Sequence, residues 1–196
     1  MTKLKICGVK YLEDVEFLNE LKVDYIGMIN EPNTPRYVDL EKIRKAINIS
    51  KIPIVLVKSS INIDEIEKIP NEYIQIHRVL KDEELEMLST IENKKVILYV
   101  PARLDYINYL KKAIKYTKFV LIDSFDKTIS NINILKTMLE EYKEAGIAGG
   151  ININNIYDYV KLEPGFIDIS RGVEETTGKK SKEKVEFVLK VIKNEL

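Results

Sequence analysis

Cys7 and Asp123 are the two residues of this 196-residue chain whose types and positions are most suited to acid–base chemistry. Each ends a short run rich in β-branched residues. A thiolate works as a base near neutral pH when a cation or a helix N-terminus lowers its pKa. An aspartic acid that stays protonated in a partly buried site works as an acid. The alternatives are a small buried hydrophobe for the cysteine and a loop cap for the aspartate.

Two later segments combine small residues with a cation and predict a phosphate site. Small side chains let backbone N–H groups approach an anion closely. The segment after the seventh short run could instead serve only to turn the chain toward the next helix. The residues of the predicted phosphate site are Gly149, Gly150, Ser170, Arg171 and Gly172.

Three further side chains are candidates for binding or support. Arg36 lies in a polar turn and could hold a carboxylate through two parallel hydrogen bonds, or it could pair with a surface acid. Gln75 and His77 stand at the end of the fourth short run, where we expect them to support the site. His77 is the only histidine, and the alternative for it is a hydrogen-bonded core residue.

These residues must be positioned by an alternation of short apolar runs with longer stretches of helical period. Most runs are continuously apolar, which is typical of parallel strands covered by helices. Asp39 and Ser181 are placed to cap the helices that follow them. The eight runs are Leu4–Cys7, Tyr25–Ile29, Pro53–Val57, Tyr73–His77, Val96–Val100, Phe119–Asp123, Ile147–Ala148 and Phe166–Ser170.

Eight strands alternating with helices predict an α/β fold, a single compact (β/α)8 TIM barrel with eight parallel strands over residues 1–196. In such barrels the active site gathers at the carboxyl ends of the strands, and phosphate binds at the loops after strands seven and eight. A doubly wound open sheet is the alternative fold. Its dinucleotide fingerprint is absent, because the segment after the first run contains only Gly8.

Composition excludes several other classes. One cysteine forms no internal disulfide, and one cysteine with one histidine cannot supply the usual four ligands of structural zinc, so we expect no metal. Lys and Arg number 31 against 31 Asp and Glu, which argues against a non-specific nucleic-acid binder. No stretch approaches the ~20 apolar residues of a membrane span, and the N-terminus lacks the core of a signal peptide. We therefore expect a cytoplasmic protein without a membrane partner.

Taken together, six motifs in order resemble the phosphoribosylanthranilate isomerase family of tryptophan biosynthesis over nearly the whole chain. The family patterns are KICG, DYIGF with P.SPRYV, VQLHG, LLDS, LAGGL and DVSSGVE..PG.KD. The matching segments are Lys5-Ile6-Cys7-Gly8, Asp24-Tyr25-Ile26-Gly27 with Pro35-Arg36-Tyr37-Val38, Ile74-Gln75-Ile76-His77, Leu121-Ile122-Asp123-Ser124, Ala148-Gly149-Gly150-Ile151 and Asp168-Ile169-Ser170-Arg171-Gly172-Val173-Glu174.

The resemblance implies an Amadori rearrangement of an aminoaldose phosphate, without cofactor or metal. It implies that Cys7 is the general base that takes the C2′ proton and that Asp123 is the general acid that opens the furanose ring. It further implies that Arg36 holds the anthranilate carboxylate and that the two later segments surround the phosphate of the small-molecule substrate. The oligomeric state expected is a monomer or a homodimer.

The chain departs from the family pattern in places. The family carries a glycine-rich GGTGK.FDW segment after the sixth strand, whereas residues 124–131 are shorter and lack those glycines. Arg171 replaces a small residue beside the expected phosphate. Two alternatives therefore stay open: another phosphosugar aminoaldose isomerase barrel, and a non-catalytic barrel that binds a phosphorylated ligand.

Overall fold

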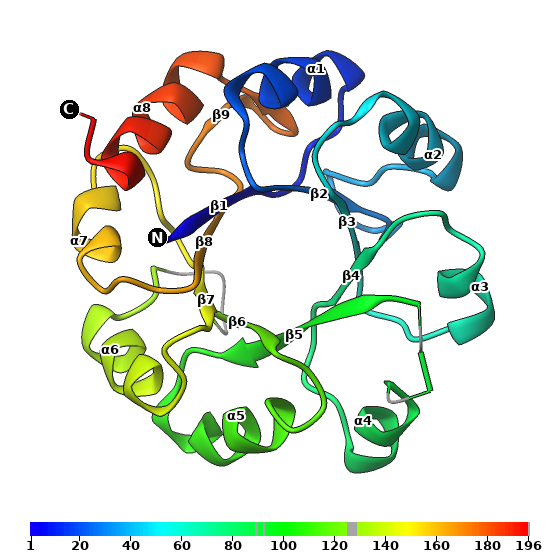
Figure 1. Cartoon of the computed structure of the whole chain (residues 1–196), viewed down its shortest axis with the longest axis vertical. Coiled ribbons are helices and arrows are strands. Elements are labelled where there is room, and N and C mark those ends of the chain that lie inside the picture. Colours follow the sequence, from blue (N-terminus) through cyan, green and yellow to red (C-terminus); the bar gives the residue numbers. More distant parts are fainter. Residues whose placement is uncertain (89, 92, 125–128, 196) are drawn as a thin grey trace.

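The computed structural model describes residues 1–88, 90–91, 93–124 and 129–195. Eight parallel strands close into a barrel in chain order, with helices around it (Figure 1). Each strand lies within one residue of a predicted run at either end, so the predicted (β/α)8 barrel is confirmed. The strands are β1 Lys3–Ile6, β2 Tyr25–Ile29, β3 Ile54–Lys58, β4 Tyr73–Ile76, β5 Lys95–Pro101, β6 Phe119–Asp123, β7 Gly146–Ile147 and β8 Phe166–Ile169.

Helices connect the strands and cover the outside of the barrel. Asp39 and Ser181 cap their helices as predicted, accepting hydrogen bonds from the N–H groups of Lys42 and Lys184. Among the described residues, no helix is both long and apolar enough to cross a membrane. The helices are α1 Leu12–Leu21, α2 Leu40–Ile49, α3 Ile63–Glu67, α4 Asp82–Leu88, η1 Leu104–Tyr106, α5 Ile107–Ala113, α6 Ile132–Glu141, α7 Ile156–Val160 and α8 Lys182–Lys193.

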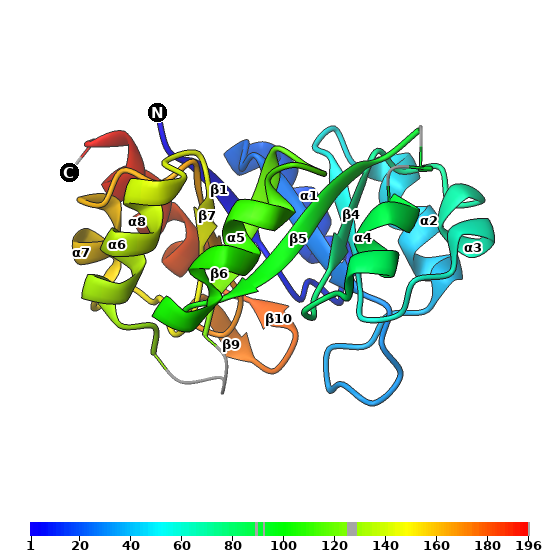
Figure 2. The same ribbon diagram turned by 90° about the horizontal axis from the view of Figure 1, so that it is seen from below.

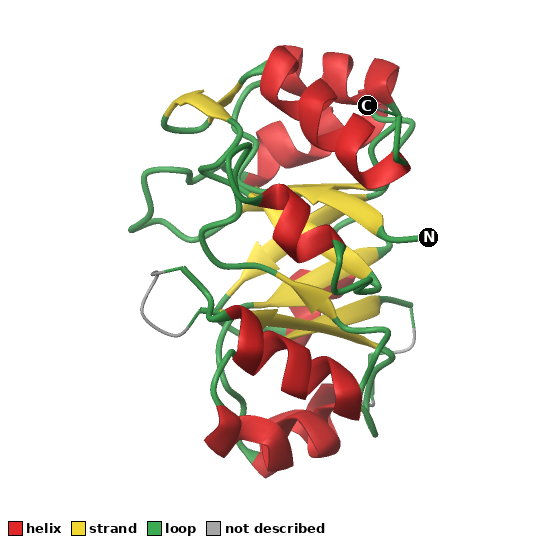
Figure 3. Cartoon of the chain, turned by 90° about the vertical axis from the view of Figure 1, so that its left-hand side faces the viewer, coloured by secondary structure: helices red, strands yellow, loops and turns green. Residues whose placement is uncertain are grey.

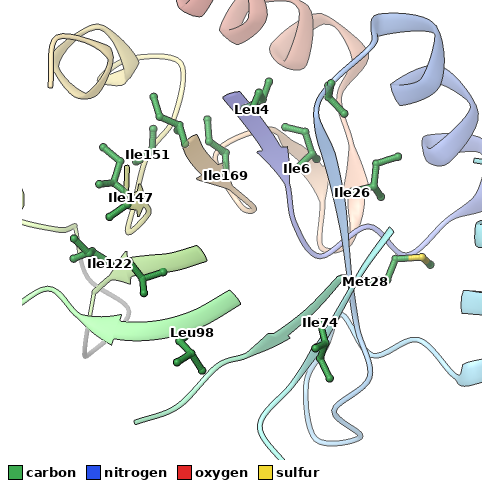
Figure 4. Close-up of a cluster of buried hydrophobic side chains, with 14 of the residues drawn as sticks. Leu4, Ile6, Ile26, Met28, Ile74, Leu98, Ile122, Ile147, Ile151 and Ile169 are labelled. Carbon is green, nitrogen blue, oxygen red and sulfur yellow. The ribbon is translucent and has the colours of Figure 1, made fainter. Parts of the chain in front are cut away.

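Alternation along the strands divides the buried side chains into two sets. Leu4 and Ile6 of β1 point outward and pack with their counterparts on other strands beneath the helices (Figure 4). Lys5 and Cys7 point the other way, into the barrel, where Cys7 joins a separate inner cluster. The period of two therefore places a charged residue and the only cysteine side by side inside the barrel.

The amino end of the barrel interior is filled by aromatic rings. Tyr25, Tyr73, Phe119 and Phe166 come from the four even-numbered strands, which is how a layer of a (β/α)8 barrel is built. Neighbouring rings meet edge to face, with centroids 5.2 Å apart for Tyr25 and Tyr73. This layer closes the amino end of the barrel.

The loops of interest project from the opposite, carboxyl end. Figures 2 and 3 show the loop after β2 and a short hairpin on the side of the molecule away from the N-terminus. The hairpin joins β9 Glu174–Thr176 to β10 Lys179–Lys180 in antiparallel pairing. The sequence did not predict it, because its strands are charged and only two or three residues long.

Candidate active site

A cavity of about 630 Å³ opens at the carboxyl end of the barrel. Every site residue that the sequence predicted lines it, drawn from both strand ends and loops. These residues are Cys7, Arg36, Gln75, His77, Asp123, Gly149, Gly150, Ser170, Arg171 and Gly172. The structure therefore brings together side chains that lie as far apart in sequence as Cys7 and Gly172.

Cys7 follows directly after β1 and is 7% exposed. Gly27 of β2 makes room for it, since a Cβ there would stand 2.7 Å from the sulfur and 3.0 Å from the Lys5 Nζ. Burial raises the pKa of the Cys7 thiol, and the Lys5 ammonium is the strongest influence opposing that rise. The thiol is therefore buried, as in the hydrophobic alternative, but it also faces the cavity and a cation.

Asp123 is the last residue of β6, and 19% of its side chain is exposed. Its carboxylate accepts a hydrogen bond of 2.7 Å from the N–H of Ser124, so part of its role is the predicted local cap. Burial, reinforced by the negative charge of Asp168, raises the pKa of Asp123 to about 6. A carboxyl with this pKa holds its proton much closer to neutrality than an ordinary aspartate.

His77 and Gln75 stand beside Asp123. The Gln75 Nε2 lies 3.0 Å from the His77 Nδ1, and in this orientation of the amide the histidine carries its proton on Nε2. That nitrogen lies 3.6 Å from a carboxylate oxygen of Asp123. The His77 side chain is 40% exposed, so the core alternative for this residue is wrong.

Arg36 pairs with an acid rather than facing the cavity alone. Its Nε and Nη2 donate to the two carboxylate oxygens of Glu174 at 2.8 and 2.6 Å. Glu174 is well shielded from solvent, so this is not the surface pair that was the alternative. Gly8 makes room for the arginine, because a Cβ there would stand 2.6 Å from the Arg36 Cδ.

The two glycines after β7 adopt backbone conformations that other residues rarely adopt. Gly149 has φ of 101° and Gly150 has φ of 70°. A Cβ on Gly149 would overlap the Ser130 hydroxyl, and one on Gly150 would stand 2.7 Å from Ile129. Within the described part of the chain, no backbone carbonyl accepts a hydrogen bond from either glycine N–H. Unpaired N–H groups at a cavity wall are suited to an anion.

The segment after β6 that departs from the family pattern is only partly covered. Residues 125–128, on which the expectation about a shorter loop depends, lie outside the described residues. Ile129 and Ser130 are described, and the Ser130 N–H donates to the Gly149 carbonyl at 3.1 Å. The end of this segment therefore packs directly on the glycines of the predicted phosphate site.

The family patterns include the positions of Lys5, Asp168, Glu174 and Lys180 but assign them no role. Lys5 and Asp168 form a buried ion pair of 2.7 Å, and Glu174 also accepts a hydrogen bond from Lys180. A signal was present, because Lys5 and Asp168 are charged residues inside otherwise apolar strands. Such residues are almost never fully buried unless they are paired.

Fold and cavity together define a (β/α)8-barrel enzyme whose polar side chains meet at the carboxyl ends of the strands. Residues 4–191 match the family model of N-(5′-phosphoribosyl)anthranilate (PRA) isomerase. The chain is 39% identical to the N-(5′-phosphoribosyl)anthranilate isomerase of Saccharolobus solfataricus, over 98% of this chain and 97% of that one. The chain therefore belongs to the N-(5′-phosphoribosyl)anthranilate isomerase family, as its motifs indicated.

Solved structures agree with this assignment. A monomeric form of the dimeric phosphoribosylanthranilate isomerase from Thermotoga maritima superimposes with a TM-score of 0.85, at 25% identity, covering 99% of this chain and all of that one. A phosphoribosyl anthranilate isomerase in complex with reduced 1-(o-carboxyphenylamino)-1-deoxyribulose 5-phosphate gives a TM-score of 0.82 at 26% identity, with the same coverage. The barrel of this chain is thus the barrel of its family.

Proposed function

We propose that this chain converts N-(5′-phosphoribosyl)anthranilate to 1-(2-carboxyphenylamino)-1-deoxyribulose 5-phosphate by general acid–base catalysis, as a step of tryptophan biosynthesis. The observation that carries the proposal is the single cavity wall shared by Cys7, Asp123, Arg36 and the two glycines after β7. Membership of the isomerase family supports it, as does the relative solved with a reduced form of the product.

In this proposal Asp123 gives its proton to the ring oxygen, which opens the furanose and leaves an iminium ion at C1′. The Cys7 thiolate then removes the proton from C2′, which yields the enolamine that tautomerises to the ketone. The pKa of Asp123, raised to about 6, supports the first role because the carboxyl needs a proton to donate. Cys7 and Asp123 come from β1 and β6, so they can act on different atoms of one sugar.

Binding of the two ends of the substrate is assigned to different residues of the cavity wall. Arg36 holds the anthranilate carboxylate. The phosphate lies against the N–H groups after β7 and the residues after β8, where Arg171 adds a positive charge. The residues of this phosphate site are Gly149, Gly150, Ser170, Arg171 and Gly172.

Gln75 and His77 act in support, by presenting the Nε2–H of the histidine toward Asp123. We further propose that residues 1–196 work as one domain, because β1 and β8 pair with each other and close the barrel. The chain works without a cofactor, in the cytoplasm, as a monomer or a homodimer.

The decisive experiment follows the loss of phosphoribosylanthranilate fluorescence with purified protein. We expect the wild type to turn over the substrate. We expect Cys7→Ala and Asp123→Asn each to lose most of this activity while still binding a product analogue. Binding of the analogue without any turnover by the wild type would overturn the proposal in favour of a non-catalytic barrel. The aminoaldose of histidine synthesis is assayed in parallel, because a preference for that substrate would indicate a different isomerase.

A further inference from the structure

A buried ion pair borders the cavity and acts on both proposed reacting residues. Lys5 is completely buried, and its Nζ lies 2.7 Å from the Asp168 Oδ2. The pair joins β1 to β8, where the two residues are register partners. Burying two charges is expensive even when they are paired, so a pair in this position needs a reason beyond stability.

The pair is oriented. Its ammonium end lies beside Cys7, because the Lys5 Nζ and the Cys7 sulfur both face the bare Cα of Gly27. Its carboxylate end lines the cavity together with Asp123. Among the described residues, the Asp168 Oδ1 is buried without a hydrogen-bond partner, so this oxygen is left to act through its charge.

We propose that the Lys5–Asp168 pair positions the protons of the reaction, with its ammonium end favouring the thiolate form of Cys7 and its carboxylate end favouring the protonated form of Asp123. The inference rests on the proposed function, because it assigns a purpose to the pair only if Cys7 is the base and Asp123 the acid. Lys5 and Asp168 are positioning residues here, since they act through Cys7 and Asp123.

The charges around Cys7 are consistent with this role. Three cations from different elements act on the thiol, and two carboxylates pair with those cations, which leaves one positive charge that a thiolate would neutralise. These groups are Lys5 of β1, Arg36 of the loop after β2, Lys180 of β10, Asp168 of β8 and Glu174 of β9.

Each end of the pair also has its larger effect on the residue it faces. Lys5 lowers the pKa of the Cys7 thiol more than Asp168 raises it, which partly offsets the rise caused by burial. At Asp123 the order is reversed, and the pKa-raising effect of Asp168 exceeds the lowering effect of Lys5. The pair thus separates the proton affinities of the two reacting groups in the direction that the reaction needs.

The test uses the fact that Cys7 is the only cysteine of the chain. The rate of alkylation of the thiol by iodoacetamide, followed against pH, therefore reports Cys7 alone, and thiolate absorbance at 240 nm does so once the tyrosine background of Cys7→Ala is subtracted. Lys5→Met is expected to raise the thiol pKa, slow alkylation at pH 8 about tenfold for each unit of that rise, and lower kcat with little change in KM. Asp168→Asn is expected to have the opposite effect on the thiol and to lower the pKa of Asp123, followed by NMR of ¹³C-labelled aspartate.

Lys3→Met is the matched control, since Lys3 lies on the same strand and face but contacts Tyr25 at the amino end of the barrel. It should leave the thiol titration unchanged. An unchanged thiol titration in folded Lys5→Met would overturn the proposal. If that variant does not fold, Lys5→Met/Asp168→Asn leaves no uncompensated charge, and wild-type pKa values of both Cys7 and Asp123 in it would overturn the proposal equally.

Failure of the proposed function remains distinguishable. If Cys7→Ala kept wild-type turnover, Cys7 would not be the base, even if Lys5→Met shifted the thiol titration as expected. A different result is that Cys7→Ala loses turnover while Lys5→Met keeps a wild-type thiol titration and kcat. The assignment of Cys7 as the base would then be retained, and the positioning role of Lys5 would be refuted.

Discussion

Glu174 occupies one edge of the Arg36 guanidinium and leaves the other edge to the cavity. The bonded edge consists of Nε and Nη2. The remaining donors, both on Nη1 and one on Nη2, have no acceptor within the described part of the chain and can bind a second carboxylate bidentately. Because Glu174 also binds Lys180 and the N–H of Gly178, the arginine is tied to the β9–β10 hairpin.

We predict that Arg36→Ala raises KM roughly 10- to 100-fold and changes kcat much less, since it removes a charge-assisted hydrogen bond to the anthranilate carboxylate. Glu174→Gln keeps the arginine but loosens it, so a smaller rise in KM is expected. Steady-state kinetics with phosphoribosylanthranilate measure both. An unchanged KM in Arg36→Ala would refute the assignment of the carboxylate to this residue.

Asp123→Asn is expected to stabilise the fold at neutral pH while it abolishes activity. The pKa of Asp123 is about 6 in the folded chain and 3.8 ordinarily, so the folded state binds the proton more tightly. Stability from this group is complete below pH 3.8 and is lost as the pH rises through 6. The difference between these two pKa values corresponds to about 3 kcal/mol of unfolding free energy, which is the upper bound on the gain at pH 8.

Denaturant unfolding of wild type and Asp123→Asn from pH 4 to pH 8 checks this prediction. The gain should be absent at pH 4 and grow to its full value above pH 6. A gain that is independent of pH would instead indicate repacking around the asparagine.

His77→Asn is expected to lower kcat about tenfold and leave KM close to that of the wild type. The variant loses the Nε2–H that faces the Asp123 carboxylate at 3.6 Å, a donor that stabilises the carboxylate left after Asp123 has given up its proton. The apparent pKa of Asp123 in the pH profile should therefore rise, opposite to the effect expected of Asp168→Asn. A profile identical to that of the wild type would leave His77 without a role in support of Asp123.

Gly149→Ala is expected to weaken phosphate binding. An alanine there meets both an unfavourable φ and the Ser130 hydroxyl, at a cost of roughly 1–3 kcal/mol in strain. Competitive inhibition by inorganic phosphate, measured as Ki, should weaken about tenfold or more. Gly165→Ala is the control for a steric clash away from the cavity, since Gly165 precedes β8 and its Cβ would overlap the carbonyl of Glu144, which precedes β7. Equal Ki values in the two variants would contradict a phosphate site at Gly149.

The sequence predicted the eight strands and the residues at their carboxyl ends, because a continuous apolar run marks a buried strand whatever its partners. It did not predict what those residues contact. Lys5 and Asp168 are 163 residues apart, and Arg36 and Glu174 are 138 residues apart. Each pair depends on strand register or hairpin placement, and a slip of one residue would send Lys5 to the outer face of the barrel.

The seam between β1 and β8 also ties chemical reactivity to the completion of folding. Lys5 finds its counter-ion only when the last strand of the barrel has paired with the first. A chain that lacks β8 carries the same cysteine without the ion pair beside it. The alkylation rate of Cys7 can therefore be used during refolding as a probe of the pairing of β1 with β8.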